Sequence, residues 1–306
     1  MLIPHGYNVI AFNSGSETKI NINVQFKRKN DVKFNTKIKA TLVACAMVCS
    51  GSVLALGDPV PSGYTLVEGH NGAAIFQRGS YYAILVDLDK ADIKLDNVES
   101  SNMQQNGYEM YKRINLSEHW NKYATSSTVA MVNGQFFDHE TNANHAAITY
   151  PLYSHGSAIN HKIDDNKNTL TLVKNWHGKY KILKGFKPSY INDANLLLVG
   201  FDKNKTLGRT DGIIPKDRTY VGGITGDCWI GASTCGFKYL VFIVSNNTRM
   251  NSNVAELNKW GVFDEHVMRL DGADSSQLKS RKVSFDASGS ARKLPHSIEI
   301  LNRKDY

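Results

Sequence analysis

The amino-acid sequence predicts an α+β fold in which a largely antiparallel sheet core carries a few packed helices, all within a single domain. Three observations support this class. Short apolar runs recur along the chain with Asn, Asp, Lys and Gly between them, which is typical of strands joined by turns. Two other segments place helix-capping residues ahead of an apolar face. No repeat of roughly 20–50 residues and no linker divides the chain.

The first element in order is an export leader at residues 32–55. Residues 33–39 are basic, residues 40–55 are uncharged and apolar, and Val53-Leu54-Ala55 has the small-residue pattern that signal peptidase accepts. The apolar run of about sixteen residues is short of the roughly 20 that span a bilayer, which favours a cleaved leader over a membrane anchor. We therefore expect a periplasmic or secreted protein with no stable membrane span after leader cleavage.

Two further features concern where the mature chain begins. Residues 1–31 precede the basic stretch without any motif, and the hypothesis is that they are an untranslated extension, with synthesis starting at Val32. The order Leu42-Val43-Ala44-Cys45 matches a lipobox, but most of the apolar run follows Cys45, which argues against a lipoprotein. The expected organisation is an extension at 1–31, a signal peptide at 32–55, a lead-in at 56–80 and one domain at 81–306.

Composition and charge limit the class of protein and of partner. The chain has 306 residues, of which 42% are hydrophobic, so it can bury a substantial core. The net charge is +8, but residues 1–55 hold seven Lys or Arg against Glu17 and Asp31, which leaves only +3 for the rest. In the rest, basic and acidic residues are interleaved, so we expect no nucleic-acid partner.

The mature chain begins with strands at residues 81–89 and 93–98, joined by a turn at 90–92, and an antiparallel sheet is expected to start there. A helix with Ser117 as its N-cap follows, and residues 129–132 form a short buried strand. Further strands are expected at residues 146–148, 169–173, 180–183, 195–201, 220–224 and 240–244.

The clearest helix signal lies near the C-terminal end. Asn253 and Glu256 form an N-cap pair, an apolar face follows, and Gly261 closes the helix. A strand at residues 267–270 comes next. The order of helix, short strand and Gly-containing polar turn repeats the order found before Asn133.

Two cysteines remain after the leader is removed, Cys228 and Cys235. One close pair in an exported chain predicts a disulfide bond. A zinc site needs more ligands than two cysteines at this spacing, and no histidine pair lies nearby at finger spacing. None of the ten histidines shows the spacing of a metal motif, so no metal and no cofactor are expected.

Polar residues at the ends of two buried strands are the strongest candidates for an active site. The first turn, residues 133–138, reads Asn-Gly-Gln-Phe-Phe-Asp, and on its own it is equally well explained as an ordinary turn with Asp138 as a cap. The second turn, residues 271–277, holds two carboxylates, two serines and an amide, more than a turn requires. Gly272 is expected to let the backbone turn sharply, and Asp274 to cap a helix whose free amides face an anion.

These segments resemble the phosphodiester glycosidase family, which includes the lysosomal uncovering enzyme and many exported bacterial proteins. The resemblance lies in Asn133-Gly-Gln-Phe-Phe137, in Arg218-Thr219 followed by Gly222, and in Leu270-Asp-Gly-Ala-Asp-Ser-Ser276, in the family's order, and it covers roughly residues 80–300. Gln135 and Ala273 stand where the family usually has Gly, and Asp274 where a small residue is common.

The resemblance implies hydrolysis of a sugar-1-phosphodiester, of the N-acetylglucosamine-1-phosphodiester type, with a carbohydrate or glycan-phosphate as the substrate. Asp271 is the first choice for the reactive carboxylate at the oxocarbenium-like centre, with Asp138 and Asp274 as reserves. A departing phosphate is a weak base and needs charge stabilisation more than a proton, which Arg218 is expected to supply.

The remaining roles concern binding. Asn133 is expected to hydrogen-bond a sugar hydroxyl or acetamide, and Ser275 and Ser276 to hold phosphate oxygens. Gly134, Thr219, Gly272 and Asp274 complete the expected substrate-binding set.

Two alternatives stay open at this point. A serine hydrolase would use Ser275 or Ser276 as the nucleophile, although no Gly-x-Ser-x-Gly motif occurs and no histidine is identifiably paired with them. A glycan-binding module that has lost its chemistry on the same scaffold would account for Gln135 and Ala273. The enzyme is the preferred interpretation.

Overall fold

The structure is a computed structural model of the 306-residue chain. It describes residues 7–14, 17–24, 60–105, 107–142, 144–160, 168–203, 214–226, 236–286 and 292–303. The chain divides into two compact units, residues 1–49 and 50–306. In the first unit, β1 (Tyr7–Ser14) and β2 (Glu17–Val24) form an antiparallel hairpin. In the part of the chain that is described, no helix is both long and apolar enough to cross a membrane.

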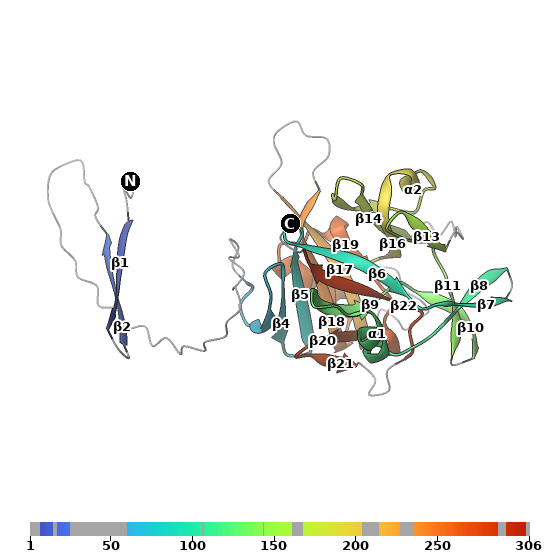
Figure 1. The fold of residues 1–306 in the computed structure, drawn as a ribbon, viewed down its shortest axis with the longest axis horizontal. Helices are drawn as coiled ribbons and strands as arrows, with labels where there is room; N and C mark the ends of the chain where they lie inside the picture. The colour runs from blue at the N-terminus through green and yellow to red at the C-terminus, as the bar shows by residue number, and fades with distance from the viewer. Residues whose placement is uncertain are drawn as a thin grey trace. The chain divides into compact units, whose positions relative to one another are not determined.

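One large antiparallel sheet runs through the second unit (Figure 1). Its strands are β3 (Thr65–Gly69), β4 (Ala73–Arg78), β5 (Tyr81–Asp87), β12 (Leu152–Ser154), β13 (Ser157–Asn160), β14 (Thr169–Asn175), β15 (Tyr180–Lys184), β16 (Ala194–Asp202), β17 (Lys216–Thr225), β18 (Phe237–Thr248) and β19 (Val267–Arg269). Their hydrogen-bonded order is β13-β12-β16-β19-β17-β18-β5-β4-β3, and the hairpin of β14 and β15 joins at β16.

A five-stranded sheet packs against the large sheet. Its strands are β6 (Ala91–Asn97), β9 (Thr128–Asn133), β20 (Gln277–Ser280), β21 (Ser284–Asp286) and β22 (His296–Asn302). They are ordered β21-β20-β9-β22-β6. Val132 and Ile298 from this sheet share one buried cluster with Val221, Phe242 and Met268 from the large sheet. The space between the two sheets is therefore the main core, as in a β-sandwich.

Side-chain alternation explains why the middle of the longest strand, residues 240–244 of β18, is a continuous apolar run. In β18, Leu240, Phe242 and Val244 point into the core between the sheets, whereas Val241 and Ile243 point to the opposite face. That face is covered by α3 (Met250–Lys259), which contributes apolar side chains to the same cluster. A strand buried on both faces needs an unbroken apolar run.

The smaller elements lie at the margins of the two sheets. Helix α1 (Leu116–Tyr123) contacts β9 and β20, and α2 (Ser189–Asp193) contacts β16. The strands β7 (Ser100–Gln105), β8 (Tyr108–Lys112), β10 (Phe137–Asn142) and β11 (His145–Ile148) form a third, four-stranded sheet. Two 3₁₀ turns are η1 (Asp264–His266) and η2 (Ala273–Ser275).

The predicted α+β class is wrong, because the described chain is largely antiparallel β-sheet. The three described helices have only eight, five and ten residues, and they cover the sheets without forming a layer of their own. The two strands expected at residues 81–89 and 93–98 exist, but they do not pair with each other. β5 pairs with β4 and β18, whereas β6 pairs with β22, so the chain crosses from one sheet to the other at residues 88–90.

Both predicted helix caps are displaced, although both helices exist. The N-cap of α1 is Asn115, whose Oδ1 accepts the Glu118 amide at 2.8 Å, while the Glu118 carboxylate accepts the Asn115 amide at 2.8 Å. Asn253 lies inside α3 and bonds instead to Ser245 and Thr248. Gly261 follows α3 with φ +83°, as expected of a C-terminal glycine.

Candidate functional site

The first and second turns lie side by side and are joined by hydrogen bonds. The Asn133 Nδ2 donates to the Asp271 carbonyl at 2.8 Å, and the Asp271 amide donates to the Gly134 carbonyl at 3.3 Å. The sequence placed both turns in one site, and the structure brings them together. They meet where β9 of the five-stranded sheet ends next to β19 of the large sheet.

Asn133 is the central connector of this junction. It is fully buried, and its Oδ1 accepts the Thr219 hydroxyl at 2.7 Å and the Gln277 amide at 3.1 Å. One side chain thus ties β9 to β17, to the second turn and to β20. These contacts use the carbonyl oxygen and one amide hydrogen, so at most one hydrogen remains for the predicted sugar contact.

Gly134 is required by close packing. A Cβ at this position would lie 1.9 Å from Cε1 of His296, which is buried in β22. Burial lowers the pKa of His296 to about 3, so the ring is neutral. Its Nε2 lies 3.3 Å from the Gln135 carbonyl, which fixes the ring beneath the first turn.

The Gln135 side chain also has a structural role. Its Nε2 donates to the Tyr150 carbonyl at 2.8 Å, and its Oε1 accepts the Val199 amide at 2.9 Å. The amide therefore bridges two backbone segments from within the protein. Phe136 packs against Phe201 with ring centroids 4.5 Å apart, and Phe137 is buried in a separate cluster, so both rings support the turn.

Asp271 is a buried carboxyl group with an unusual electrostatic environment. Its Oδ1 accepts the Gly272 amide at 2.9 Å, whereas Oδ2 has no hydrogen-bond partner among the described residues. Burial raises the pKa of Asp271 to about 6, and the nearby Ser275 hydroxyl and the charges of Arg292 and Arg269 oppose that rise. A carboxyl group that titrates near neutrality is typical of a group that exchanges protons during catalysis.

Arg292 is the cation at this site that the sequence did not indicate. Its Nη1 donates to the Ser275 hydroxyl at 3.2 Å and lies 4.0 Å from Oδ2 of Asp271. Its guanidinium stacks on the Phe137 ring, with Cζ 4.4 Å from the ring centroid. Nothing in its local sequence distinguishes it from Lys293, because it belongs to none of the three motifs.

The second turn differs in detail from the expectation. Gly272 has φ −137°, and its lack of a side chain matters because a Cβ would lie 3.2 Å from the Asp217 carbonyl. The left-handed residue is Ala273, with φ +52°. The helix that Asp274 was expected to cap does not exist: Asp274 lies exposed within η2, and the chain continues into β20.

The two serines are fully buried and lie on different sides of the second turn. Ser275 faces Arg292, whereas Ser276 Oγ lies 3.3 Å from the Thr219 hydroxyl, beside Asn133. Only Ser275 is therefore in contact with a cation of the site. The predicted role of Ser276 in phosphate binding stays a prediction.

Arg218 lies on the other face of β17 from Thr219, because successive side chains of a strand alternate. It is buried, and its Nε donates to the Thr248 carbonyl at 3.2 Å, next to the start of α3. Arg269 is also buried on this face; its Nη1 lies 3.9 Å from the Met250 sulfur and its Cζ 5.7 Å from the Phe136 ring. The role of Arg218 as a phosphate ligand stays a prediction.

Three predicted residues cannot be placed in this geometry. Cys228 and Cys235 lie outside the described residues, so the predicted disulfide stays a prediction. Asp138 is in β10, but its side chain lies outside the described part of the structure. Among the side chains that are described, no group of three or more His, Cys, Asp or Glu could hold a metal ion.

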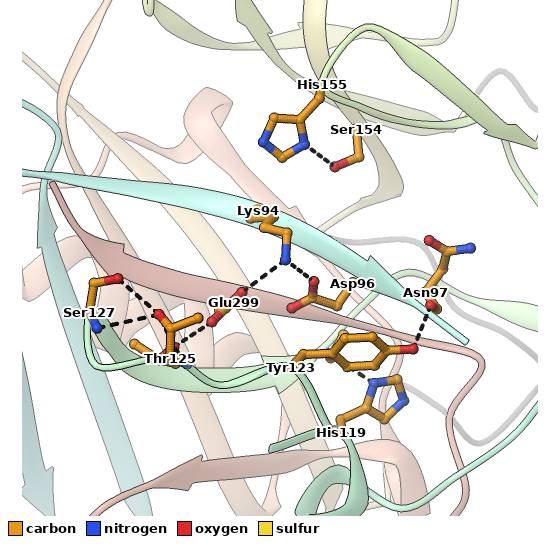
Figure 2. A network of polar contacts seen from close by, with 12 residues as sticks. Lys94, Asp96, Asn97, His119, Tyr123, Thr125, Ser127, Ser154, His155 and Glu299 are labelled. Atoms are coloured by element: carbon orange, nitrogen blue, oxygen red, sulfur yellow. Dashed lines mark hydrogen bonds and ion pairs between the residues drawn. The ribbon is translucent and has the colours of Figure 1, made fainter. Parts of the chain in front are cut away.

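A second polar cluster lies apart from the two turns, on the face of the five-stranded sheet near α1 (Figure 2). Lys94 lies between the buried carboxylates of Asp96 and Glu299, and the Thr128 hydroxyl donates to Glu299. Burial, and then the neighbouring Asp96, raise the pKa of Glu299 to about 7. All four side chains come from β6, β9 and β22, so this cluster holds neighbouring strands together.

Comparison with known proteins reveals similarity of fold alone. No protein-family model matches the chain, and no curated protein matches its sequence. A hypothetical protein from Synechocystis is 9% identical with a TM-score of 0.47, over 98% of this chain and 69% of that one. The zebrafish N-acetylglucosamine-1-phosphodiester alpha-N-acetylglucosaminidase (NAGPA) catalytic domain, auto-inhibited by its pro-peptide, is 11% identical with a TM-score of 0.49, over 83% of this chain and 87% of that one. Likeness at this level carries no argument about activity.

Proposed function

We propose that this protein is an exported hydrolase that cleaves the glycosidic bond of a sugar-1-phosphodiester and releases the sugar. The observation that carries the proposal is the junction of the two turns, which places the buried Asp271 carboxyl beside Arg292 and Ser275. The three motifs that resemble the phosphodiester glycosidase family support the same reaction. Export rests on the leader pattern of residues 32–55.

In this reaction Asp271 acts at the anomeric carbon, and a cation stabilises the negative charge of the leaving group. The bond between the anomeric carbon and the phosphate oxygen breaks, and the phosphomonoester departs with the electron pair. Asp271 acts as the nucleophile or as the base that takes a proton from water, and water supplies the hydroxyl of the released sugar. A phosphate leaving group needs positive charge nearby, and no cofactor is expected in this reaction.

The departures from the family pattern are compatible with an active enzyme. Gln135 makes its bonds to backbone groups within the fold, and Ala273 keeps a left-handed conformation of the kind a glycine adopts. Both substitutions thus leave the turns in place. This favours the enzyme over a glycan-binding module that has lost its chemistry.

The test is a panel of sugar-1-phosphodiesters, including N-acetylglucosamine-1-phosphodiesters, assayed for free sugar and phosphomonoester by mass spectrometry. We expect turnover of at least one substrate by the wild type and a loss of about 100-fold or more in Asp271→Asn. Asp193→Asn, which alters an exposed carboxylate at the end of α2, is the matched control and should retain activity.

Turnover that survives in Asp271→Asn would refute the role of this carboxylate. The absence of turnover on every member of the panel, together with binding of one of them, would favour the glycan-binding module.

A further inference from the structure

The tips of two hairpins of the large sheet lie against each other. The β14–β15 hairpin carries Trp176 in its turn, which is closed by a hydrogen bond of 3.0 Å from the Gly178 amide to the Asn175 carbonyl. The neighbouring β12–β13 hairpin turns at Gly156. A Cβ on Gly156 would lie 2.4 Å from Cη2 of Trp176, so the indole occupies the space that a side chain would take there.

Trp176 is exposed although the fold fixes its place. Its side chain is 60% exposed, and among the described residues only Phe263 leaves as large a fraction of a large apolar side chain in solvent. Apolar surface in water is unfavourable, and a ligand that covers it gains free energy. Single exposed apolar side chains are nevertheless common, so a binding site at Trp176 requires a second feature.

The second feature is a concentration of positive charge around the same turn. Residues 168–192 contain five lysines and no Asp or Glu, an exception to the interleaved charges of the rest of the chain. Lys179 is exposed where the turn enters β15. Nη2 of the exposed Arg303 lies 3.9 Å from the position that a Cβ of Gly178 would occupy. Two cations from distant parts of the chain therefore lie at the turn that carries the indole.

A structural role accounts for the other lysines of this hairpin but not for the tip. Lys174 forms an ion pair with Asp92 of β6. In the described sheet β15 pairs with β14 alone, and lysines such as Lys181 and Lys184 on an edge strand hinder association with other edges. Neither role explains an exposed indole with two cations beside it.

The hairpin tip and the two turns lie at opposite ends of the sandwich. The strand β6 begins near the tip, where Asp92 accepts the hydroxyl of Tyr180, and ends at Asn97, which pairs with His296 beneath the first turn. The five residues between these ends span about 17 Å of strand. A small ligand at Trp176 therefore does not reach Asp271.

We infer that Trp176, Lys179 and Arg303 form a binding site for an anionic glycan, separate from the site at the two turns. A sugar ring presents a face of C–H groups that packs on an indole, and its phosphate, sulfate or carboxylate groups bind to the cations. Nucleic acids also combine stacking rings with negative charge, but the predicted export favours a glycan. The inference does not depend on the reaction proposed at the two turns.

The test measures binding to the full mature chain by isothermal titration calorimetry with four probes: dextran sulfate, unsulfated dextran of the same length, polyphosphate and a single-stranded oligonucleotide. We expect dextran sulfate to bind, with an affinity that falls as the salt concentration rises. Dextran and polyphosphate should each bind about tenfold more weakly or less, because the first lacks the charges and the second lacks the sugar rings.

Substitutions of the aromatic ring test the stacking contact. Trp176→Ala should weaken dextran sulfate binding by about tenfold, whereas Trp176→Phe, which keeps an aromatic face, should retain most of the affinity. Phe263→Ala is the matched control, because it removes the other aromatic ring that is 60% exposed, and it should bind as the wild type does.

Charge substitutions test the electrostatic part. Lys179→Gln combined with Arg303→Gln should weaken dextran sulfate binding by about tenfold and reduce its dependence on salt, whereas Lys282→Gln, in the turn after β20, should have little effect. Asp271→Asn should bind dextran sulfate as the wild type does, since its side chain lies at the other site. Thermal unfolding of each variant establishes that it is folded.

Four results would overturn the inference: no binding of dextran sulfate, an unchanged affinity in Trp176→Ala, polyphosphate bound as tightly as dextran sulfate, or the oligonucleotide bound more tightly than dextran sulfate. Failure of the proposed function is a separate result, since it consists of no turnover on the substrate panel while dextran sulfate binding remains as expected.

Discussion

Replacing Asn133 by alanine tests whether the junction of the two turns stabilises the fold as well as forming a site. The substitution removes the partner of two buried backbone groups, the Asp271 carbonyl and the Gln277 amide. The Thr219 hydroxyl also loses its acceptor at 2.7 Å but has Ser276 at 3.3 Å as an alternative. Each buried backbone group left without a partner costs about 1–3 kcal/mol, so we expect a loss of about 3–4 kcal/mol in the free energy of unfolding.

The assay is urea unfolding followed by tryptophan fluorescence, with thermal unfolding as a second measurement. A loss of this size should lower Tm by about 10 °C for a body of this length. Asn121→Ala is the matched control, because Asn121 is exposed on α1 and its replacement should leave stability nearly unchanged. A loss below about 1 kcal/mol in Asn133→Ala would refute the reasoning, since it would mean that the backbone groups find other partners.

Two further variants address stability. Ala273→Gly should stabilise the protein by about 0.5–1 kcal/mol, because a left-handed φ of +52° is unfavourable for alanine and not for glycine; a loss of stability would contradict this. Burial and the neighbouring Asp96 raise the pKa of Glu299 to about 7 in the folded state. Between pH 4.5 and 7 the folded protein therefore keeps a proton that the unfolded chain releases. This group consequently lowers the free energy of unfolding as the pH rises towards 7. Glu299→Gln should reduce that fall in urea midpoint between pH 5 and 8, and an identical pH dependence in the variant would exclude Glu299 as its source.

The strands were largely predictable because their signal is local. A strand that is buried on one or both faces needs apolar residues, and such runs are visible in the sequence of β9, β16 and β18. The strands expected at these three segments were confirmed. The partners of strands were less predictable. The turn between β5 and β6 reads like that of a hairpin, yet the two strands enter different sheets, because their partners β18 and β22 lie far away in sequence.

The prediction of the fold class was wrong for a related reason. Capping residues such as Asn253 and Glu256 favour a helix, but they do not report how much of the chain is helical. The Asn253 side chain instead forms hydrogen bonds with Ser245 and Thr248, near the end of β18. No local sequence pattern could indicate these contacts. The helices are therefore short and cover a structure made mainly of sheets.

The proximity of the two turns was predictable because each is part of a sequence motif. The sequence indicated that Asn133 and Asp271 act together, and they are in contact. Arg292 was missed because its place beside Asp271 is created only by the packing of β20 and β22 around the first turn. Gly272 was expected to let the backbone turn sharply, whereas the left-handed conformation is found one residue later, at Ala273.

The junction at Asn133 belongs to both halves of the sandwich, since β9 lies in one sheet and Thr219 in the other. No local opening can expose the Asp271 and Gln277 amides while the sheets stay packed, so their hydrogens should exchange with solvent only when the whole sandwich opens. A ligand bound between the turns therefore stabilises the whole sandwich, and its binding free energy adds to the free energy of global unfolding.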